Sequence, residues 1–310
     1  MAAEGSTKAV VTALVANLGI AVSKFVAAGI TGSASMLAEG VHSVADSTNQ
    51  ALLLVGGKRA RRAPTALHPF GYARERYVYS FIVAIILFTL GGLYALYEGY
   101  HKISDPHELS SPLIAVAVLV IAIALEGFAL RTAVKEANKV RGKRSWVSFV
   151  RHARAPELPV ILLEDAGALL GLLFALSGVG LSVLTGNALF DGIGTLCIGV
   201  LLVVIAVVLA VETKSLLIGE AALPEEVTAI HTELVSTPGV DRVIHLRTLH
   251  LGPEELLVAA KIAISTSDRG ADVAATIDDA EARIRRALPI ATAIYLEPDI
   301  DRQPARTSAT

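Results

Sequence analysis

Hydrophobic residues fill the chain up to about residue 212 in six long runs, which short polar segments separate. Each run holds roughly 20 residues, the length that an α-helix needs to cross a hydrocarbon core about 30 Å thick. The pattern therefore predicts a six-helix transmembrane domain at residues 1–212. The expected spans are Val10 to Ile30, Ser35 to Gly57, Tyr77 to Tyr100, Pro112 to Val134, Pro159 to Leu184 and Ala188 to Val211.

The rest of the chain is more polar and changes its periodicity, so a second domain is expected there. Residues 213–223 form the predicted linker, residues 224–300 the domain and residues 301–310 a flexible tail. Helical and strand-like apolar spacing follow one another in the order α-β-β-α-β, which suits a small α+β sandwich. The expected elements are Val227 to Val235, Val240 to His250, Leu256 to Ser265, Asp272 to Leu288 and Ala291 to Leu296.

Composition supports a membrane protein, since 53% of the residues are hydrophobic and 18% are charged. The formal net charge of −2 argues against a nucleic-acid partner. The single cysteine, Cys197, excludes an intramolecular disulfide and a thiolate cluster from one chain, and it is expected to be a packing residue. Met1 to Thr7 lack a basic region and a cleavage site, so no secretory signal peptide is predicted.

Basic residues gather in two of the loops between the predicted spans, whereas the opposite loops carry only Lys102. Loops rich in lysine and arginine stay on the cytoplasmic side, so both termini are expected in the cytoplasm, and a bacterial chain would lie in the inner membrane. The basic residues are Lys58, Arg59, Arg61, Arg62, Arg74 and Arg76 after the second span, and Lys135, Lys139, Arg141, Lys143, Arg144, Arg151 and Arg154 after the fourth.

Two ionisable residues, His42 and Asp46, interrupt the second run. Residues four apart on a helix share one face, so an imidazole and a carboxylate can bind one ion from the same side. Ionisable groups cost about 2.5 to 3.5 kcal/mol at the centre of a bilayer and therefore indicate function. These ligand types suit Zn²⁺ and accept Mn²⁺, Fe²⁺ or Co²⁺. The alternative is a buried hydrogen bond between His42 and Asp46 that only packs helices.

The fifth run carries two adjacent acids, Glu164 and Asp165. Neighbouring helix positions diverge by about 100°, so both carboxylates cannot point squarely at one ion. Asp165 is the preferred ligand and Glu164 a supporting or proton-handling group, with the reverse assignment as the alternative. Small residues nearby would let the fifth span approach the second closely. They are Ala166, Gly167, Ala168 and Gly171.

Other polar residues of the spans are candidates for holding the ligands in place or for gating access to them. This group consists of Asn17, Ser43, Asn49 and Glu39. Glu39 is either an approach group that faces outward or a residue near water at a helix end. Lys24 is expected to be a snorkelling or paired cation, and Asp191 a helix cap.

Metal binding by such a site must displace protons, because carboxylates and imidazoles bind metals in their deprotonated forms. Metal ions and protons therefore compete for the same groups. In a protein with inward-facing and outward-facing states, this competition is sufficient for metal/proton antiport.

These features together resemble the cation diffusion facilitator family of zinc transporters over nearly the whole chain. The resemblance rests on the six spans, on the segment from Gly32 to Asp46, on His68-Pro69-Phe70-Gly71-Tyr72 before the third span, and on the tail with Leu246-Arg247-Thr248. His42-Ser43-x-x-Asp46-Ser47-x-Asn49-Gln50 and Leu163-Glu164-Asp165 are similar to the zinc-transporter-nine branch. The resemblance implies a homodimer that exports zinc or a related divalent cation in exchange for protons. It also implies a ferredoxin-like cytoplasmic domain and no organic cofactor.

The chain departs from the family pattern at three places. Ala168 and Leu169 stand where a second ligand of the fifth span is expected, so the fourth ligand is water, Glu164 or a residue of another span. Tyr72 and Tyr295 stand where some relatives carry histidine. Little or no metal is therefore expected in the tail, with dimerisation through packing instead.

Two other classes of function compete with proton-coupled export. An intramembrane metallohydrolase would need an open metal position and a general base, but no His-Glu-x-x-His or similar motif occurs, so an enzyme is not expected. A scaffold or metal sensor that transports nothing is favoured if the incomplete site of the fifth span does not bind metal.

Overall fold

The computed structural model describes residues 18–106 and 111–300, which form two compact units. The first unit extends to Arg62 and continues with Glu75–Lys214, and the second joins Ala63–Arg74 to the chain from Ser215 onward. The expected flexible tail and the start of the first span, including Asn17, lie outside the described residues.

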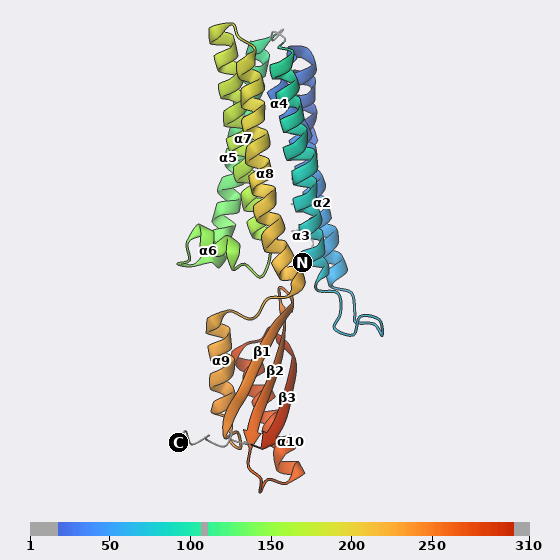
Figure 1. The fold of residues 1–310 in the computed structure, drawn as a ribbon, viewed down its shortest axis with the longest axis vertical. Helices are drawn as coiled ribbons and strands as arrows, with labels where there is room; N and C mark the ends of the chain where they lie inside the picture. Colours follow the sequence, from blue (N-terminus) through green and yellow to red (C-terminus); the bar gives the residue numbers. More distant parts are fainter. Residues whose placement is uncertain (1–17, 107–110, 301–310) are drawn as a thin grey trace, which may run out of the picture. The chain divides into compact units, whose positions relative to one another are not determined.

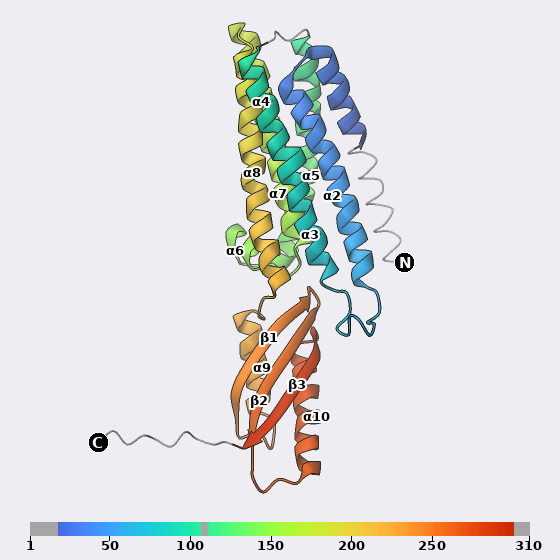
Figure 2. The same ribbon diagram turned by 45° about the vertical axis from the view of Figure 1, so that its right-hand side comes forward.

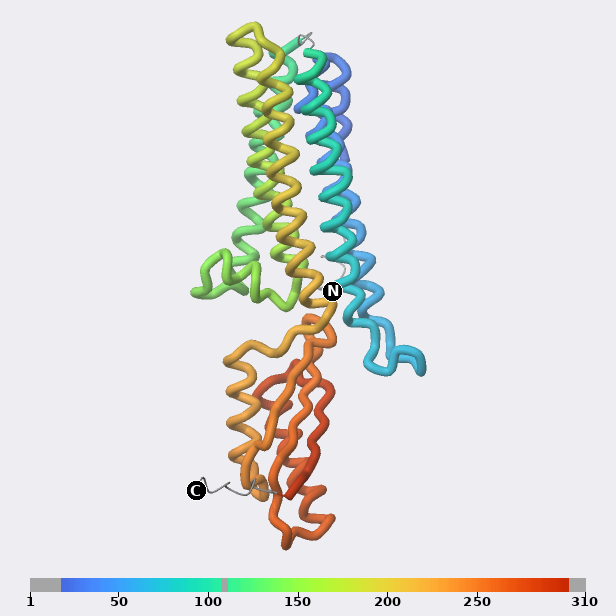
Figure 3. The backbone as a smooth tube through the Cα atoms, in the orientation of Figure 1, coloured from blue at the N-terminus to red at the C-terminus, as the bar shows by residue number. Residues whose placement is uncertain are grey.

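The first unit is a bundle of long helices that lie side by side (Figures 1 and 2). A helix at Leu18–Thr31 precedes the labelled ones. The others are α2 (Ala34–Ala60), α3 (Glu75–Ile86), η1 (Leu87–Leu93), α4 (Tyr94–Ser104), α5 (Pro112–Arg141), α6 (Trp146–Arg151), α7 (Glu157–Thr185) and α8 (Leu189–Ile218). The segment η1 is a π-helical turn, and the backbone passes through it from α3 to α4 as one rod (Figure 3).

Four of these helices are long and apolar enough to cross a membrane. They are Glu75–Ser104, Pro112–Arg141, Glu157–Thr185 and Leu189–Ile218, and they coincide with the third to sixth expected spans. The helix Leu18–Thr31 and α2 lie at the first two expected positions. Large apolar side chains such as Phe128 and Leu184, 72% and 84% exposed, cover the outside of the bundle, as lipid contact requires. Cys197 also lies on this exposed surface, which corrects its expected role as a packing residue.

Glycines allow the helices to approach closely. A Cβ atom added at Gly99 would lie 2.8 Å from the backbone nitrogen of Leu196, and one at Gly92 would lie 2.6 Å from the side chain of Val203. Both contacts join the third span to α8. Close backbone approach through small residues is the usual way in which helices pack in lipid, where hydrophobic burial contributes little between them.

Two buried charges cap neighbouring helices. Asp191 was expected to cap a helix, and it accepts hydrogen bonds at the start of α2: 2.8 Å from the Ala34 nitrogen and 3.0 Å from the Ser33 hydroxyl. A carboxylate at a helix N-terminus satisfies free N–H groups and complements the helix dipole. Lys102 donates to the Gly32 carbonyl oxygen at 3.0 Å, at the end of the helix Leu18–Thr31.

The second unit contains α9 (Pro224–Val235), β1 (Arg242–Gly252), β2 (Glu255–Ile264), α10 (Gly270–Ala287) and β3 (Ala291–Ile300), in the expected order. Strand β2 lies in the middle of the sheet, antiparallel to β1 and parallel to β3. Both helices pack on the sheet through Ile230, Leu234, Ala280 and Ile284. Strand β3 is longer than expected, because its pairing with β2 continues to Ile300.

Candidate metal site in the helix bundle

His42 and Asp46 share one face of α2, as their spacing predicts. The His42 Nε2 atom lies 3.5 Å from Asp46 Oδ2, which is longer than an ordinary N–H···O hydrogen bond. Within the part of the chain that the structure describes, both ring nitrogens of His42 and Oδ1 of Asp46 lack a hydrogen-bond partner. Buried polar atoms are rarely left in this way unless a site uses them. The pair is therefore poorly explained as a hydrogen bond that packs helices.

The π-helical turn η1 lies beside His42. A Cβ atom at Gly91 would lie 3.8 Å from the His42 Nδ1 atom, an ordinary contact distance, so this turn packs directly against the imidazole. Insertions of this kind in a helix often occur at functional sites.

On α7, Glu164 is 4% exposed, and Asp165 is less buried. The Glu164 Oε1 atom accepts a hydrogen bond from Asn49 Nδ2 at 2.6 Å, and this bond joins α7 to α2. Asn49, a candidate for holding the ligands in place, thus contacts one of the predicted ligands. Close approach of these helices, expected from the small residues of the fifth run, is confirmed, since a Cβ atom at Gly171 would lie 2.6 Å from Glu39 Oε1.

A cavity of about 10 Å³ lies between α2, α5 and α7, and carboxylates dominate its lining. This volume is close to the minimum that one water molecule needs. Four acids line the cavity together with Ser43, Gln50, Ile20 and Ile161, and no lysine or arginine of the described chain does so. The acids are Asp46, Glu126, Glu164 and Asp165. The structure thus brings three of the four predicted ligands to one cavity, with His42 next to one of them.

Glu126 of α5 is a residue that the sequence analysis missed. A signal for it was present, because it is the only acid in the apolar run from Pro112 to Val134. An ionisable residue inside a span indicates function by default. The spacing that singles out His42 and Asp46 has no counterpart around Glu126, so only the folded arrangement associates it with the other acids.

Lys24 and Glu39 form a second polar group next to the cavity. The Lys24 Nζ atom lies 3.1 Å from Glu39 Oε2 and donates to the Ser43 hydroxyl at 2.7 Å. Both charged side chains are 0% exposed. The interpretation of Glu39 as an outward-facing or water-exposed residue is wrong, because the ion pair lies inside the bundle. Lys24 is a paired cation, one of the two roles expected for it.

Metal ligation itself needs more than these contacts. Among the described residues, no group of three or more His, Cys, Asp or Glu side chains is arranged to hold a metal ion. His42, Asp46, Glu164 and Asp165 therefore remain predicted ligands, drawn to one region of the bundle but not arranged as a complete coordination shell.

The geometry defines a class of protein: a multi-pass membrane protein whose helices enclose carboxylates and a histidine. The sequence profile of the cation efflux transmembrane domain matches residues 10–218, and that of the cation efflux protein cytoplasmic domain matches residues 222–299. The chain belongs to the cation efflux family, which is a family of transporters. Its resemblance to the cation diffusion facilitators is thereby confirmed.

Curated relatives agree with this assignment. The chain is 34% identical over 261 residues to the proton-coupled zinc antiporter SLC30A9, mitochondrial, of Xenopus laevis, an alignment that covers 84% of this chain and 47% of the relative. The protein of the same name from Homo sapiens is 33% identical over 84% of this chain and 46% of its own length. Metal tolerance protein C4 of Arabidopsis thaliana is 31% identical over 83% and 57%. The chain spans about half the length of these relatives.

Proposed function

We propose that the protein exports Zn²⁺ from the cytoplasm in exchange for protons by alternating access. The observation that carries the proposal is the cavity where carboxylates from α2, α5 and α7 meet beside the unpartnered imidazole of His42. Relatives named as proton-coupled zinc antiporters support it.

The ligands that we propose are His42, Asp46 and Asp165, with Glu164 and Glu126 completing the negative charge around the ion. Asn49 occupies one oxygen of Glu164, which favours Asp165 as the direct ligand from α7. A small movement of α7 towards α2 would assemble the set around a cation. Carboxylate-rich sites discriminate weakly among first-row metals, so Mn²⁺, Fe²⁺ and Co²⁺ are alternative substrates.

Proton coupling follows from the same residues. A divalent cation replaces protons on groups that the bundle otherwise isolates from water. When the site faces the compartment with more protons, protons displace the metal and the cycle reverses. Each half of the exchange thus needs only the cavity and two accessible states.

For the architecture we propose six spans, with both termini in the cytoplasm, and a homodimer. The helices at all six expected positions and the basic loops support this topology. We further propose domain bounds of 1–212 and 224–300, joined by a linker at 213–223, with residues 301–310 as a tail. The α-β-β-α-β order and the sheet pairing of the second unit support a ferredoxin-like fold.

Zinc uptake into inside-out proteoliposomes with an acidic lumen tests the function. Wild-type protein should accumulate Zn²⁺ only while the pH gradient lasts, and Mn²⁺ as competitor reports selectivity. A matched control is Glu136→Gln, which removes an exposed carboxylate paired with Lys139 on the same helix as Glu126. If neither metal accumulates, the alternative of a sensor or scaffold that transports nothing is favoured.

The two acids of α7 are distinguished by comparing Asp165→Asn with Glu164→Gln in the same assay. We expect Asp165→Asn to lower uptake by more, because loss of a direct ligand removes more binding energy than loss of a supporting group, which typically costs about 10- to 100-fold. A larger loss in Glu164→Gln would exchange the two roles.

A further inference from the structure

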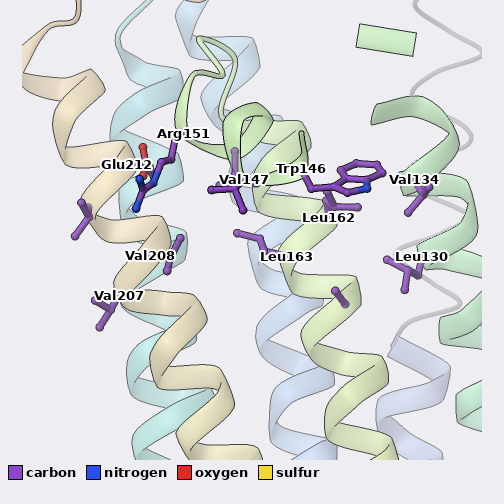
Figure 4. Close-up of a pocket in the computed structure, with 13 residues that line it drawn as sticks. Leu130, Val134, Trp146, Val147, Arg151, Leu162, Leu163, Val207, Val208 and Glu212 are labelled. Atoms are coloured by element: carbon purple, nitrogen blue, oxygen red, sulfur yellow. The ribbon is translucent and has the colours of Figure 1, made fainter. Parts of the chain in front are cut away.

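A second cavity, of about 580 Å³, opens between α5, α6, α7 and α8 (Figure 4). Eleven of its thirteen lining residues are apolar, and the other two are Arg151 and Glu212. Its volume lies within the range of about 300 to 1,000 Å³ that is typical of ligand sites. The proposed metal site does not include this cavity, so its apolar lining needs a separate explanation.

The two charged residues lie together at one end of the cavity. In Figure 4, Arg151 of α6 and Glu212 of α8 lie next to each other on the left, whereas the apolar side chains of Trp146, Leu130 and Val134 lie on the right. Glu212 and Arg151 attract each other electrostatically. A cavity with one charged end and a long apolar remainder fits an amphipathic molecule that has a polar head and a hydrocarbon chain.

The short helix α6 is built for a membrane surface. Phe149, 2% exposed, packs against Leu162 of α7, whereas Val147 is 65% exposed. Trp146 lines the cavity and lies under the guanidinium of Arg141, 4.2 Å from the ring centroid. Tryptophan next to basic residues is typical of the boundary between hydrocarbon and headgroups.

The positive charge of the chain around this cavity favours a lipid with an anionic headgroup. Between Glu136 and Glu157 the chain has six cations and no acid. Basic clusters directly beside transmembrane helices attract anionic lipids, by about 1 kcal/mol per residue, which corresponds to about fivefold in affinity. Glu212 offsets only one of these charges. The cations are Lys139, Arg141, Lys143, Arg144, Arg151 and Arg154.

We propose that this cavity is a binding site for one anionic phospholipid. An acyl chain occupies the apolar part, and the phosphate contacts Arg151. The acyl chain would pack on Leu162, Leu163 and Ala166 of α7, a side of the helix directed away from Glu164, since successive residues turn by about 100°. The lipid would thus support the helix that carries two of the proposed ligands. The inference depends on the membrane location alone, so it can hold or fail independently of transport.

Trp146 makes the proposal directly testable, because it is the only tryptophan in the chain and it lines the cavity. The full-length protein is placed in phosphatidylcholine vesicles that contain a fixed fraction of either phosphatidylglycerol or phosphatidylcholine with brominated acyl chains. Bromine quenches tryptophan on contact. We expect the brominated phosphatidylglycerol to quench Trp146 with about fivefold higher relative affinity than the brominated phosphatidylcholine.

Two variants locate the effect. Arg151→Gln should abolish the preference for phosphatidylglycerol while leaving quenching by bulk lipid, and Ala166→Phe should reduce quenching by both lipids because it fills the cavity. Arg61→Gln is the matched control, since it removes an exposed cation from the other basic loop and should keep the preference.

Equal quenching of the wild-type protein by the two brominated lipids would overturn the proposal, as would a preference that survives in Arg151→Gln. If Trp146 is quenched by neither lipid at high protein density but by both after dilution in the bilayer, a second copy of the chain covers the cavity and the lipid site is wrong. The comparison of the two lipids uses only the wild-type protein, so its result does not depend on whether a variant folds.

Discussion

Two groups of charged residues lie beside α2, and they differ in whether they contain a lysine. The first, Lys24 with Glu39 and Ser43, contains its own cation, and the 3.1 Å ion pair is buried within the bundle. The second, the acids around the small cavity, has no lysine or arginine in its lining within the described chain. By our proposal, the presence of an internal counter-ion, and not burial alone, distinguishes the structural charges of this bundle from the functional ones.

The two groups also share a boundary. Ser43 accepts a hydrogen bond from Lys24 and lines the acidic cavity. Glu39, Ser43 and Asp46 follow one another at helical spacing, so they form one stripe of α2. Through Ser43, the fixed cation Lys24 thus lies next to the cavity where, by our proposal, a transported cation binds and leaves.

The largest expected effect is the loss of transport when the acidic cavity loses its proposed metal ligands. His42→Ala and Asp46→Ala should each lower zinc uptake by about a hundredfold or more, since direct ligands matter at least as much as the outer groups that support them. Uptake into proteoliposomes, with the dimer checked by size-exclusion chromatography, measures this. Near-normal uptake by both variants would place the cation elsewhere in the bundle.

The next effect concerns the buried ion pair of Lys24 and Glu39. Lys24→Met leaves the Glu39 carboxylate buried without a partner, and breaking a buried ion pair in this way typically costs about 3 to 5 kcal/mol. We expect a marked drop in thermal stability in detergent. The double variant Lys24→Met with Glu39→Leu should recover most of the loss, because an apolar pair of similar volume needs no counter-ion. Equal instability of the single and double variants would show that the pair is held by packing and not by charge.

A smaller effect is expected at Glu126. Glu126→Gln removes one of the four acids that line the cavity but none of the proposed direct ligands, so zinc uptake should fall by about tenfold. Thermal stability should change little, in contrast to Lys24→Met. Glu136→Gln, on the same helix, serves as the control. Uptake unchanged by Glu126→Gln would remove this residue from the proposed transport site.

The contrast between the two groups also shows which features of the fold and of the site can be predicted from the sequence. The apolar runs, the α-β-β-α-β order and the pairing of His42 with Asp46 depend on local spacing, and the structure contains them. Lys24 with Glu39 and Asp191 with Ala34 join residues 15 and 157 positions apart. Which partner satisfies a buried charge is decided by helix packing, so local spacing predicts neither the burial of Glu39 in an ion pair nor the place of Glu126 at the cavity.

The smallest effect is expected for an ion pair of the second unit. It tests how strongly the surroundings of a charge determine its contribution to stability. On strand β2, Lys261 lies 2.8 Å from Asp299 and 3.0 Å from Glu297 of β3. These hydrogen bonds raise the pKa of Lys261. A raised pKa stabilises the fold at every pH below the unfolded value, about 10.4, and the gain is lost as the pH rises through the folded value.

Lys261→Met should therefore slightly accelerate hydrogen exchange of the β2 and β3 amides in the full-length protein, to the same extent at pH 6 and pH 8 once intrinsic exchange rates are taken into account. Exposed pairs contribute little because water screens both charges. Arg247→Met, at an exposed position of β1, is the control. If Lys261→Met instead destabilised the second unit as strongly as Lys24→Met destabilises the bundle, the counter-ion itself, and not its burial, would determine the energy of both pairs.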